Sequence, residues 1–461
     1  MSLLHYALYG LSVGGSKFYY ESIDTNVAEI EPAHQLPDGG LLVTSNHSFH
    51  MFDSIALMNA LNRSDVYFLA YSTLYKGLLL GFWYKRLQQG RLRSTLERLE
   101  DTIRLSLLRG AHMIPLNREK DGRGDFGSQR ENFTYFDEAA ALIAQGHVVV
   151  VYPDGGSPDG YNHADVKAGA ALLALQAASM KNAEVPIHLL RAGITYSSFY
   201  EPLHSSVQVQ FASPISLEDW APVDKKDARR KRKLLTPLIQ EGIRSNMAFA
   251  PLEHTRAVEL ISALLKDEEP ELLTRTRRAS SIIEELSEAG QWCDLEQELV
   301  DYDQLAHQLK VPPGTEVELP DTPTLRSRIT GLCARVGEWL FGFPGTLSRK
   351  LTQSPPTLLH LRGYRSYLIW VLLHVVWITV SAGITEASVV YMHADALLVW
   401  PCFGSSLGLG FIASRNWPLA NFYRARAAHR EQFESYLLKS AQLRYKLLYR
   451  DEACEEGSDA T

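Results

Sequence analysis

The sequence of 461 residues lacks the cysteine pattern of a disulfide-stapled or zinc-binding protein. Its four cysteines form no CxxC pair and no set of metal-ligand spacings; they are Cys293, Cys333, Cys402 and Cys454. An excess of positive charge is also absent, since the formal net charge is -7, which argues against a general nucleic-acid binder. These absences favour a folded protein of a reducing compartment, with no structural zinc and no nucleic-acid partner.

An export signal is missing as well. Residues 3–13 are apolar, but no Lys or Arg precedes them, as the start of a signal peptide would require. A short helix in the membrane interface and an ordinary buried helix fit this segment about equally well. We therefore expect residues 1–34 to form an N-terminal interfacial or packing helix.

Alternating apolar and helical segments predict an α/β domain over residues 35–222. Residues 148–152 form an uninterrupted apolar run, which is typical of a strand covered on both faces, and Pro153 stops it. Further strands are expected at residues 40–45, 65–71, 185–196 and 207–211, and helices at 130–145 and 166–179. This alternation predicts a mixed central sheet covered by helices.

From about Val223 the sequence becomes helical and charged, and residues 223–365 are expected to form a helical extension. The extension contains the basic run Arg229–Lys233. A solvated helix face is one interpretation of this run. Attraction to anionic lipid headgroups or to the phosphates of coenzyme A is the other.

Two long apolar segments predict a transmembrane helical hairpin over residues 366–414. Tyr367–Val390 carries Glu386 as its one charge, and Ala394–Ala413 carries Asp395, so each supplies the roughly 20 residues that cross a bilayer. Arginines flank the pair on both outer sides, whereas the connecting loop has neither Lys nor Arg. The catalytic region is therefore expected to face the cytoplasm.

The segment Gly404–Gly408 matches the G-x-S-x-G motif of serine hydrolases but lacks the strand-turn-helix context of that motif. Inside an apolar span its small residues favour close helix packing instead. Residues 415–461 follow as a basic helix and an acidic tail. We expect an integral membrane protein, in the endoplasmic reticulum of a eukaryote or the inner membrane of a bacterium, with a buried hairpin in a soluble protein as the alternative.

A histidine and a carboxylate follow the first expected strand of the α/β domain. His47 comes two residues after the segment 40–45, and Asp53 lies six residues beyond His47. A His paired with a carboxylate forms a general base near neutral pH. Because six residues correspond to about 240° on a straight helix, His47 is expected in the turn before the helix. His50, which shares a helix face with Asp53, is the rival base.

Four sequence blocks follow one another in the first half of the chain. They are Asn46–Asp53, Ile114–Arg118, Val149–Ser157 and Val185–Ile187. Together they resemble the phospholipid-biosynthesis acyltransferase superfamily, and more closely its fungal branch of glycerol-3-phosphate/dihydroxyacetone-phosphate acyltransferases. The resemblance extends over roughly residues 35–265, and the C-terminal hairpin is also similar to that branch.

The resemblance implies a role for each matched residue. His47 would deprotonate the acceptor hydroxyl as it attacks the acyl-CoA thioester, and Asp53 would orient the imidazole. The residues implied to bind substrate, several of them through its phosphate, are Arg118, Asp154, Gly155, Gly156 and Ser157. Lys167, at the start of the following helix, is a further candidate to bind the phosphate. The resemblance implies no metal and no cofactor, with acyl-CoA as the co-substrate.

Three positions depart from the usual pattern of the superfamily. Asp154 stands where Glu is usual, which shortens its reach by one methylene. Tyr152 replaces the usual Phe, a change of packing with little expected consequence. His112 occupies the position that most often holds Gly. The five residues between His47 and Asp53, by contrast, agree with the fungal branch.

These observations predict a membrane-anchored transferase of phospholipid metabolism. We expect acyl transfer from acyl-CoA to glycerol 3-phosphate or dihydroxyacetone phosphate, the first step of glycerophospholipid synthesis, without an acyl-enzyme. One alternative is a lysophosphatidic acid or lysophospholipid acyltransferase on the same scaffold. The other is a catalytically silent membrane protein that binds lipid.

Overall fold

The structure, a computed structural model, describes residues 20–26, 36–49, 51–71, 90–116, 126–156, 160–180, 185–199, 205–309, 311–314, 422, 425–426 and 428–449. Several predicted features lie outside these ranges: the membrane hairpin of residues 366–414, most of the N-terminal segment 1–34, and the site residues His50, Arg118 and Ser157. Within the ranges described, no helix has both the length and the apolar character that a bilayer crossing requires.

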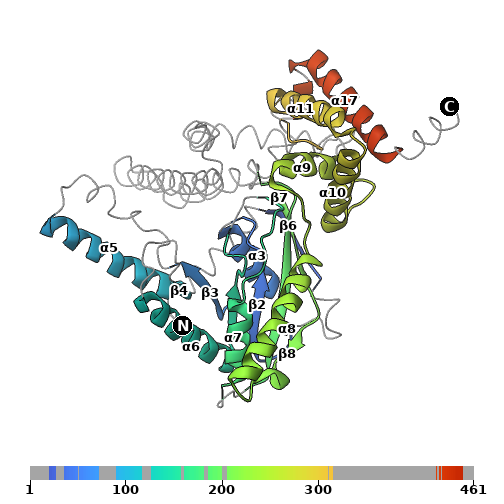
Figure 1. Cartoon of the computed structure of the whole chain (residues 1–461). Helices are drawn as coiled ribbons and strands as arrows, with labels where there is room; N and C mark the ends of the chain where they lie inside the picture. The colour runs from blue at the N-terminus through green and yellow to red at the C-terminus, as the bar shows by residue number, and fades with distance from the viewer. Residues whose placement is uncertain are drawn as a thin grey trace, which may run out of the picture.

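A mixed sheet forms the centre of the described structure (Figure 1). Its eight strands follow the order β1-β7-β6-β2-β5-β3-β4, with β8 paired to β6. The strands are β1 (Tyr20–Thr25), β2 (Gly40–Ser45), β3 (Val66–Tyr71), β4 (Met113–Leu116), β5 (Val148–Val151), β6 (Ile187–Tyr196), β7 (Ser205–Phe211) and β8 (Ile215–Ser216). From β6 to β4 all neighbours are parallel, whereas β7 and β8 run antiparallel to β6. The predicted α/β fold with a mixed sheet is confirmed.

The central strands β2 and β5 are buried along their whole length. Side chains alternate between the two faces of a strand, so Val148 and Val150 enter one hydrophobic core and Val149 and Val151 the other. Gly40 opens β2 where helix α6 (Phe126–Ala144) approaches closely. A Cβ on Gly40 would lie 1.8 Å from the carbonyl oxygen of Ile143, so this contact requires glycine.

Helices cover both faces of the sheet. Helix α3 (Met51–Leu61) contributes to the core on one face. Helices α6, α7 (Gly169–Ala178) and α8 (Lys225–Arg244) contribute to the core on the other. Helix α5 (Arg91–Gly110) contacts β4 and extends away from the sheet at the left of Figure 1.

The helical extension comprises α9 (Thr255–Leu264), α10 (Leu272–Glu288) and α11 (Trp292–Leu309). Helix α17 (Arg430–Leu448), from the C-terminal segment, packs against α11 (Figure 1). The rings of Tyr302 and Tyr436 stack with their centroids 5.2 Å apart, and Lys439 pairs with Asp301 at 2.7 Å. The chain therefore returns to the extension after the segment that we predict to be a membrane hairpin.

The N-terminal segment contributes the edge strand β1, which pairs with β7. Residues 20–25, at the end of the segment 1–34, are thus a strand. The helix that we expect over residues 3–13 lies outside the described residues.

Candidate active site

The candidate site lies at the edge of the sheet where the parallel strands end. Strands β2 and β5 are neighbours, and their register pairs Thr44 with Val151. Because parallel strands end at the same edge, the residues that follow β2 and β5 come together, and open α/β sheets bind their ligands at this edge. His47 and Tyr152 meet there, on adjacent connections.

His47 and Asp53 form a hydrogen-bonded pair. His47 lies in the turn between β2 and α3, as its spacing from Asp53 predicts, and Asp53 lies in the first turn of α3. His47 Nδ1 is 2.8 Å from Asp53 Oδ2. A carboxylate only accepts hydrogen bonds, so Nδ1 carries the hydrogen and the neutral imidazole keeps its lone pair on Nε2. The His47 side chain is 18% exposed, whereas that of Asp53 is fully buried.

The buried carboxylate of Asp53 has two further donors. The backbone N–H of Phe49 donates to Oδ2 and the hydroxyl of Tyr196 donates to Oδ1, each at 2.8 Å. Burial and the nearby charge of Asp53 raise the pKa of Tyr196 well above 10, so the phenol keeps its proton. These donors satisfy a carboxylate that would otherwise be costly to bury, and they fix the oxygen that faces His47.

Tyr152 forms a platform beneath His47. The two rings stack at a centroid separation of 4.1 Å, with 14° between their planes. The Tyr152 hydroxyl lies 3.1 Å from the hydroxyl of Ser54 on α3. Burial and the charge of Asp53 raise the pKa of Tyr152 well above 10, so its ring stays neutral. Tyr152 therefore restricts the orientation of His47, a role that the sequence analysis missed.

The side chain of Asn46 connects the turn between β2 and α3 to strand β6 through two hydrogen bonds. Its side-chain oxygen accepts a hydrogen bond from the N–H of Ile194 at 2.7 Å, and its side-chain nitrogen donates to the carbonyl of Ile194 at 2.9 Å. This pair of bonds reproduces the donor and acceptor of a strand residue. Asn46, the residue before His47, is thereby held beside the strand that carries Tyr196.

The loop after β5 brings Gly155, Gly156 and Lys167 together. Gly155 has a φ of +71°, and a Cβ there would lie 2.7 Å from the ammonium nitrogen of Lys167. The Tyr71 hydroxyl donates to the Gly155 carbonyl at 2.9 Å. Apart from its chain neighbours, no described residue has an atom within 4 Å of a Cβ placed on Gly156. Helix α7 begins just beyond Lys167, and its N-cap residue offers no side-chain hydrogen bond to the first turn.

Asp154 turns toward the protein interior. Its Oδ2 accepts a hydrogen bond from the backbone N–H of His47 at 3.2 Å, and the residue is 6% exposed. The shorter side chain thus contacts the backbone of the proposed base. The role in substrate binding that the resemblance implies for Asp154 stays a prediction, as do those of Gly155, Gly156 and Lys167.

His112 adopts a left-handed backbone conformation, with φ at +58°. This conformation suits glycine, which is the residue that the resemblance leads us to expect here. A side chain in this region costs about 1 kcal/mol, although His is among the residues that tolerate it. The ring stacks on Tyr67, with centroids 4.2 Å apart and 3° between the planes.

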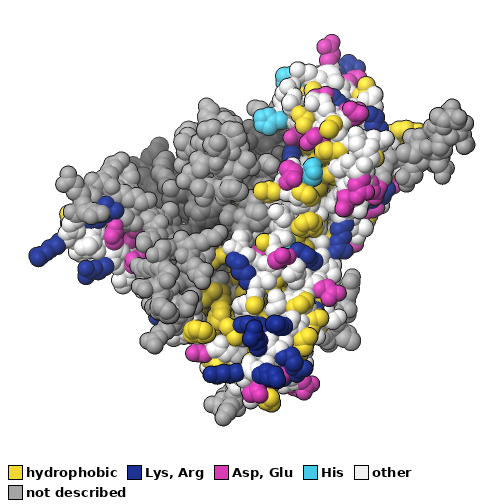
Figure 2. Space-filling model, viewed as in Figure 1, with side chains coloured by type: hydrophobic (Ala, Val, Ile, Leu, Met, Phe, Trp, Pro, Cys, Tyr) yellow, Lys and Arg dark blue, Asp and Glu magenta, His cyan; other side chains and the backbone are white. Residues whose placement is uncertain are grey.

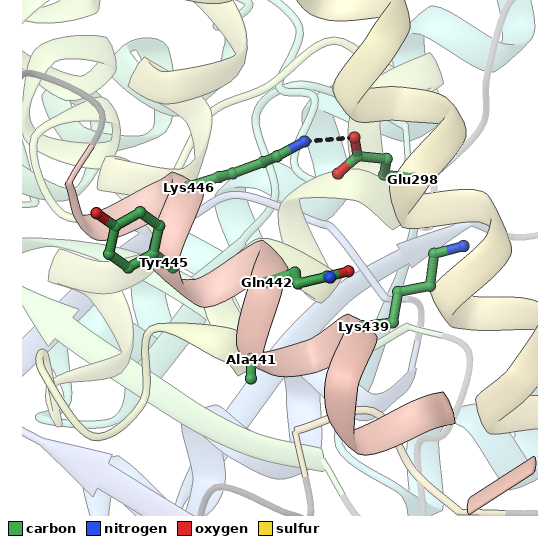
Figure 3. Close-up of a pocket in the computed structure, with 6 residues that line it drawn as sticks. All are labelled: Glu298, Lys439, Ala441, Gln442, Tyr445 and Lys446. Atoms are coloured by element: carbon green, nitrogen blue, oxygen red, sulfur yellow. Dashed lines mark hydrogen bonds and ion pairs between the residues drawn. The ribbon is translucent and has the colours of Figure 1, made fainter. Parts of the chain in front are cut away.

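Two surface hollows lie away from the sheet edge. One, of about 620 Å³, lies between α11 and α17 (Figure 3), where Lys446 pairs with Glu298 at 2.5 Å. The other, of about 470 Å³, lies beside the basic run at the start of α8, where Lys and Arg side chains gather in the lower part of Figure 2. The first hollow includes no residue predicted to bind substrate or to catalyse. The second includes Arg229, Arg230 and Lys233 of the basic run, for which attraction to the phosphates of coenzyme A is one interpretation.

Metal-ligating side chains do not cluster in the part of the chain that the structure describes. There, no group of three or more His, Cys, Asp and Glu side chains is placed to hold a metal ion. The chemistry that the site offers through its own residues is proton transfer at His47, next to an exposed loop that carries an ammonium group and backbone N–H groups.

Comparison with known proteins agrees with this chemistry. The model of the Acyltransferase family matches residues 26–190, which include His47, Asp53 and the loop after β5. Among solved structures, the chain is similar to the 1-acyl-sn-glycerophosphate (LPA) acyltransferase PlsC from Thermotoga maritima. The identity is 13%, the TM-score is 0.29, and the match covers 51% of this chain and 78% of PlsC. No curated protein matches the chain.

Proposed function

We propose that this protein transfers an acyl group from acyl-CoA to the hydroxyl of glycerol 3-phosphate or dihydroxyacetone phosphate, the first step of glycerophospholipid synthesis. One observation carries the proposal: in a segment that matches the Acyltransferase family, a fully buried carboxylate holds His47 by its Nδ1 at 2.8 Å. This arrangement gives Nε2 the lone pair that a general base needs.

The reaction is a direct transfer between two bound substrates. Nε2 of His47 takes the hydroxyl proton as the acceptor oxygen attacks the thioester carbonyl carbon. The new C–O bond forms, the C–S bond breaks, and the imidazolium returns the proton to the departing sulfur of CoA. Asp53 stabilises the imidazolium, and Tyr152 keeps the ring in place while its charge changes.

The phosphate of the acceptor binds at the loop after β5. Gly156 leaves space for a ligand to approach the backbone, Lys167 supplies a positive charge, and the first turn of α7 has no side-chain cap. Backbone N–H groups at a helix start and in a glycine-rich turn are suited to binding phosphate. Arg118 and Ser157 complete the site in this proposal, and both lie outside the described residues.

We also propose that residues 366–414 anchor the protein in a membrane, with the catalytic domain on the cytoplasmic side. The contact between α11 and α17 supports this topology. These helices precede and follow the segment, and a hairpin that crosses the bilayer twice leaves both of its flanks on the same side.

An acceptor assay tests the proposed reaction. The full chain is purified in detergent and given labelled acyl-CoA with glycerol 3-phosphate, dihydroxyacetone phosphate or lysophosphatidic acid. We expect transfer to one of the first two acceptors, loss of nearly all transfer in His47→Ala and Asp53→Ala, and a substantial remainder in His50→Ala.

Each other outcome removes a defined part of the proposal. Transfer to lysophosphatidic acid alone would overturn the assigned acceptor and favour the lysophosphatidic acid acyltransferase. Loss of activity in His50→Ala with activity kept in His47→Ala would overturn the assigned base. An absence of transfer to every acceptor would favour a lipid-binding protein.

A further inference from the structure

A second histidine-aspartate pair lies directly behind the first. His163 Nδ1 is 3.2 Å from Asp154 Oδ2, the same oxygen that accepts the backbone N–H of His47 at 3.2 Å. The side chain of His163 is fully buried and that of Asp154 is 3% exposed. His163 is thus linked to His47 through one carboxylate oxygen.

The loop around this pair is fixed at several points. Asp154 is buried at the edge of the sheet. The carbonyl of the adjoining Gly155 accepts a hydrogen bond from the Tyr71 hydroxyl at 2.9 Å. On the other side, the Tyr161 hydroxyl donates to the Tyr196 carbonyl at 2.7 Å. These bonds anchor residues on both sides of the loop, so Asp154 and His163 face each other in a defined geometry.

Two polar atoms of the His163–Asp154 pair make no hydrogen bond in the described structure. Asp154 Oδ1 and His163 Nε2 are buried and, in the described structure, have no hydrogen-bond partner. Unpaired buried polar atoms oppose folding, and native proteins keep few of them outside sites with a special role. An apolar side chain at position 163 would avoid the unpaired ring nitrogen, so fold stability alone does not account for this histidine.

We infer that His163 is a positioning residue for the acyl-transfer reaction, an inference that rests on the proposed function. Nδ1–H of His163 donates to Asp154 and fixes the carboxylate oxygen that holds the backbone N–H of His47. Asp154 thereby holds the backbone N–H of His47, while Asp53 holds the imidazole ring.

Two amide substitutions separate this role from a merely structural one. The side-chain nitrogen of Asn reaches the place of Nδ1, whereas that of Gln reaches the place of Nε2. We expect His163→Gln to lower kcat by about 10- to 100-fold, as small misplacements of catalytic groups do, with KM for acyl-CoA and acceptor within about threefold. His163→Asn keeps kcat within about threefold of wild type by restoring the donor.

Equal kcat values in the two variants, or a change confined to KM, would overturn the inference. If His163→Gln proves unstable in thermal unfolding, His163→Leu replaces it, with the same expected loss against His163→Asn. The inference is separate from the proposed function, because wild-type transfer that depends on His47 upholds the function whatever the His163 variants do.

A double-mutant cycle provides an independent check. Asp154→Asn and His163→Gln act along one path to His47, so the double variant should lose no more kcat than the more damaging single variant. Losses that multiply would show two independent effects and contradict the linkage.

Discussion

Histidine-aspartate pairs lie where strands of the central sheet end and where they begin, and the His47–Asp53 and His147–Asp65 pairs are built differently. His47 and Asp53 lie where β2 ends, at 2.8 Å, with the carboxylate fully buried. His147 and Asp65 lie where β5 and β3 begin, at 3.3 Å, and both side chains are partly exposed. Distance alone would not tell a base from a structural contact, so the surroundings of each carboxylate decide.

Arg63 distinguishes the His147–Asp65 pair from the His47–Asp53 pair. Its guanidinium donates to both oxygens of Asp65, at 2.9 and 2.5 Å, and to the carbonyls of Gly39 and Gly146. Burial raises the pKa of Asp65, but the hydrogen bonds and charge of Arg63 outweigh it and hold this pKa below 3.8. The charge of Asp65 is therefore neutralised by a permanent cation, and the cluster ties together the loops that lead into β2 and β5.

Among the residues that the structure describes, no Lys or Arg side chain is paired with Asp53 of the His47–Asp53 pair. The donors that the structure places on Asp53, besides His47, are the N–H of Phe49 and the hydroxyl of Tyr196, both neutral. The carboxylate charge thus remains available to stabilise a protonated His47. The comparison shows that the described donors of Asp53 are His47 and two neutral groups, whereas Asp65 is already paired with the permanent cation of Arg63.

The largest expected effect comes from replacing each aspartate by its neutral isostere. Asp53→Asn should lower kcat by about 10³-fold, within the range of general acid-base catalysis, because the imidazolium loses its counter-charge. Asp65→Asn should keep kcat within about twofold, since it lies at the other end of the sheet. Steady-state transfer rates measure both, and similar losses in the two variants would break the comparison.

Tyr196→Phe should have an intermediate effect. It removes one donor from the buried Asp53 without changing the packing of the ring. We expect a loss of about 1.5 to 3 kcal/mol in the free energy of unfolding, the range for hydrogen bonds to charged groups. Loss of the fixed carboxylate should lower kcat by roughly three- to tenfold. Denaturant unfolding and kinetics on the same preparation test this, and an unchanged stability would show that the bond contributes nothing.

Tyr152→Phe should have a small effect on activity. The stacked ring stays in place and only the contact with Ser54 is lost, so kcat should fall by no more than about twofold. Tyr152→Leu, which removes the aromatic face, is the matched variant and should lose more. If both variants keep wild-type kcat, the ring does not position His47.

The smallest effect concerns the pH dependence of stability at the structural pair. Because the pKa of Asp65 is lowered on folding, its contribution is present above the ordinary value of 3.8 and is lost as the pH falls through the folded value. Asp65→Asn should therefore cost roughly 0.5 to 1 kcal/mol near neutral pH, since the pair is partly exposed. That cost should shrink below pH 3.8. Unfolding curves at several pH values measure it, and a constant difference would contradict the assignment.

Much of the fold is predictable from the sequence because the buried central strands coincide with apolar segments. Strand β5 is apolar without interruption and β2 contains the apolar run Leu41–Val43, and both strands are found where they are expected. Strand β1, with the sequence YESIDT, was not predicted, because it contains no apolar run. Its polar residues suit its position at the edge of the sheet. Its place is fixed by pairing with β7, which only the folded chain shows.

The site was predictable only where its residues are close in sequence. The spacing of His47 and Asp53 places the histidine in a turn, and the structure confirms it there. Tyr152 and Tyr196 join the site through strand order, which determines that β5 and β6 flank β2. Spacing along the chain carries no information on that order, so these contacts could not be read from the sequence.

The most direct test of the account compares His47 with His147. Acyl transfer from labelled acyl-CoA to glycerol 3-phosphate is measured for wild type, His47→Ala and His147→Ala, with thermal unfolding as a check that each variant is folded. The account predicts that His47→Ala loses transfer by about 10³-fold or more, whereas His147→Ala keeps a rate within about twofold of wild type. Wild-type transfer by folded His47→Ala would contradict it.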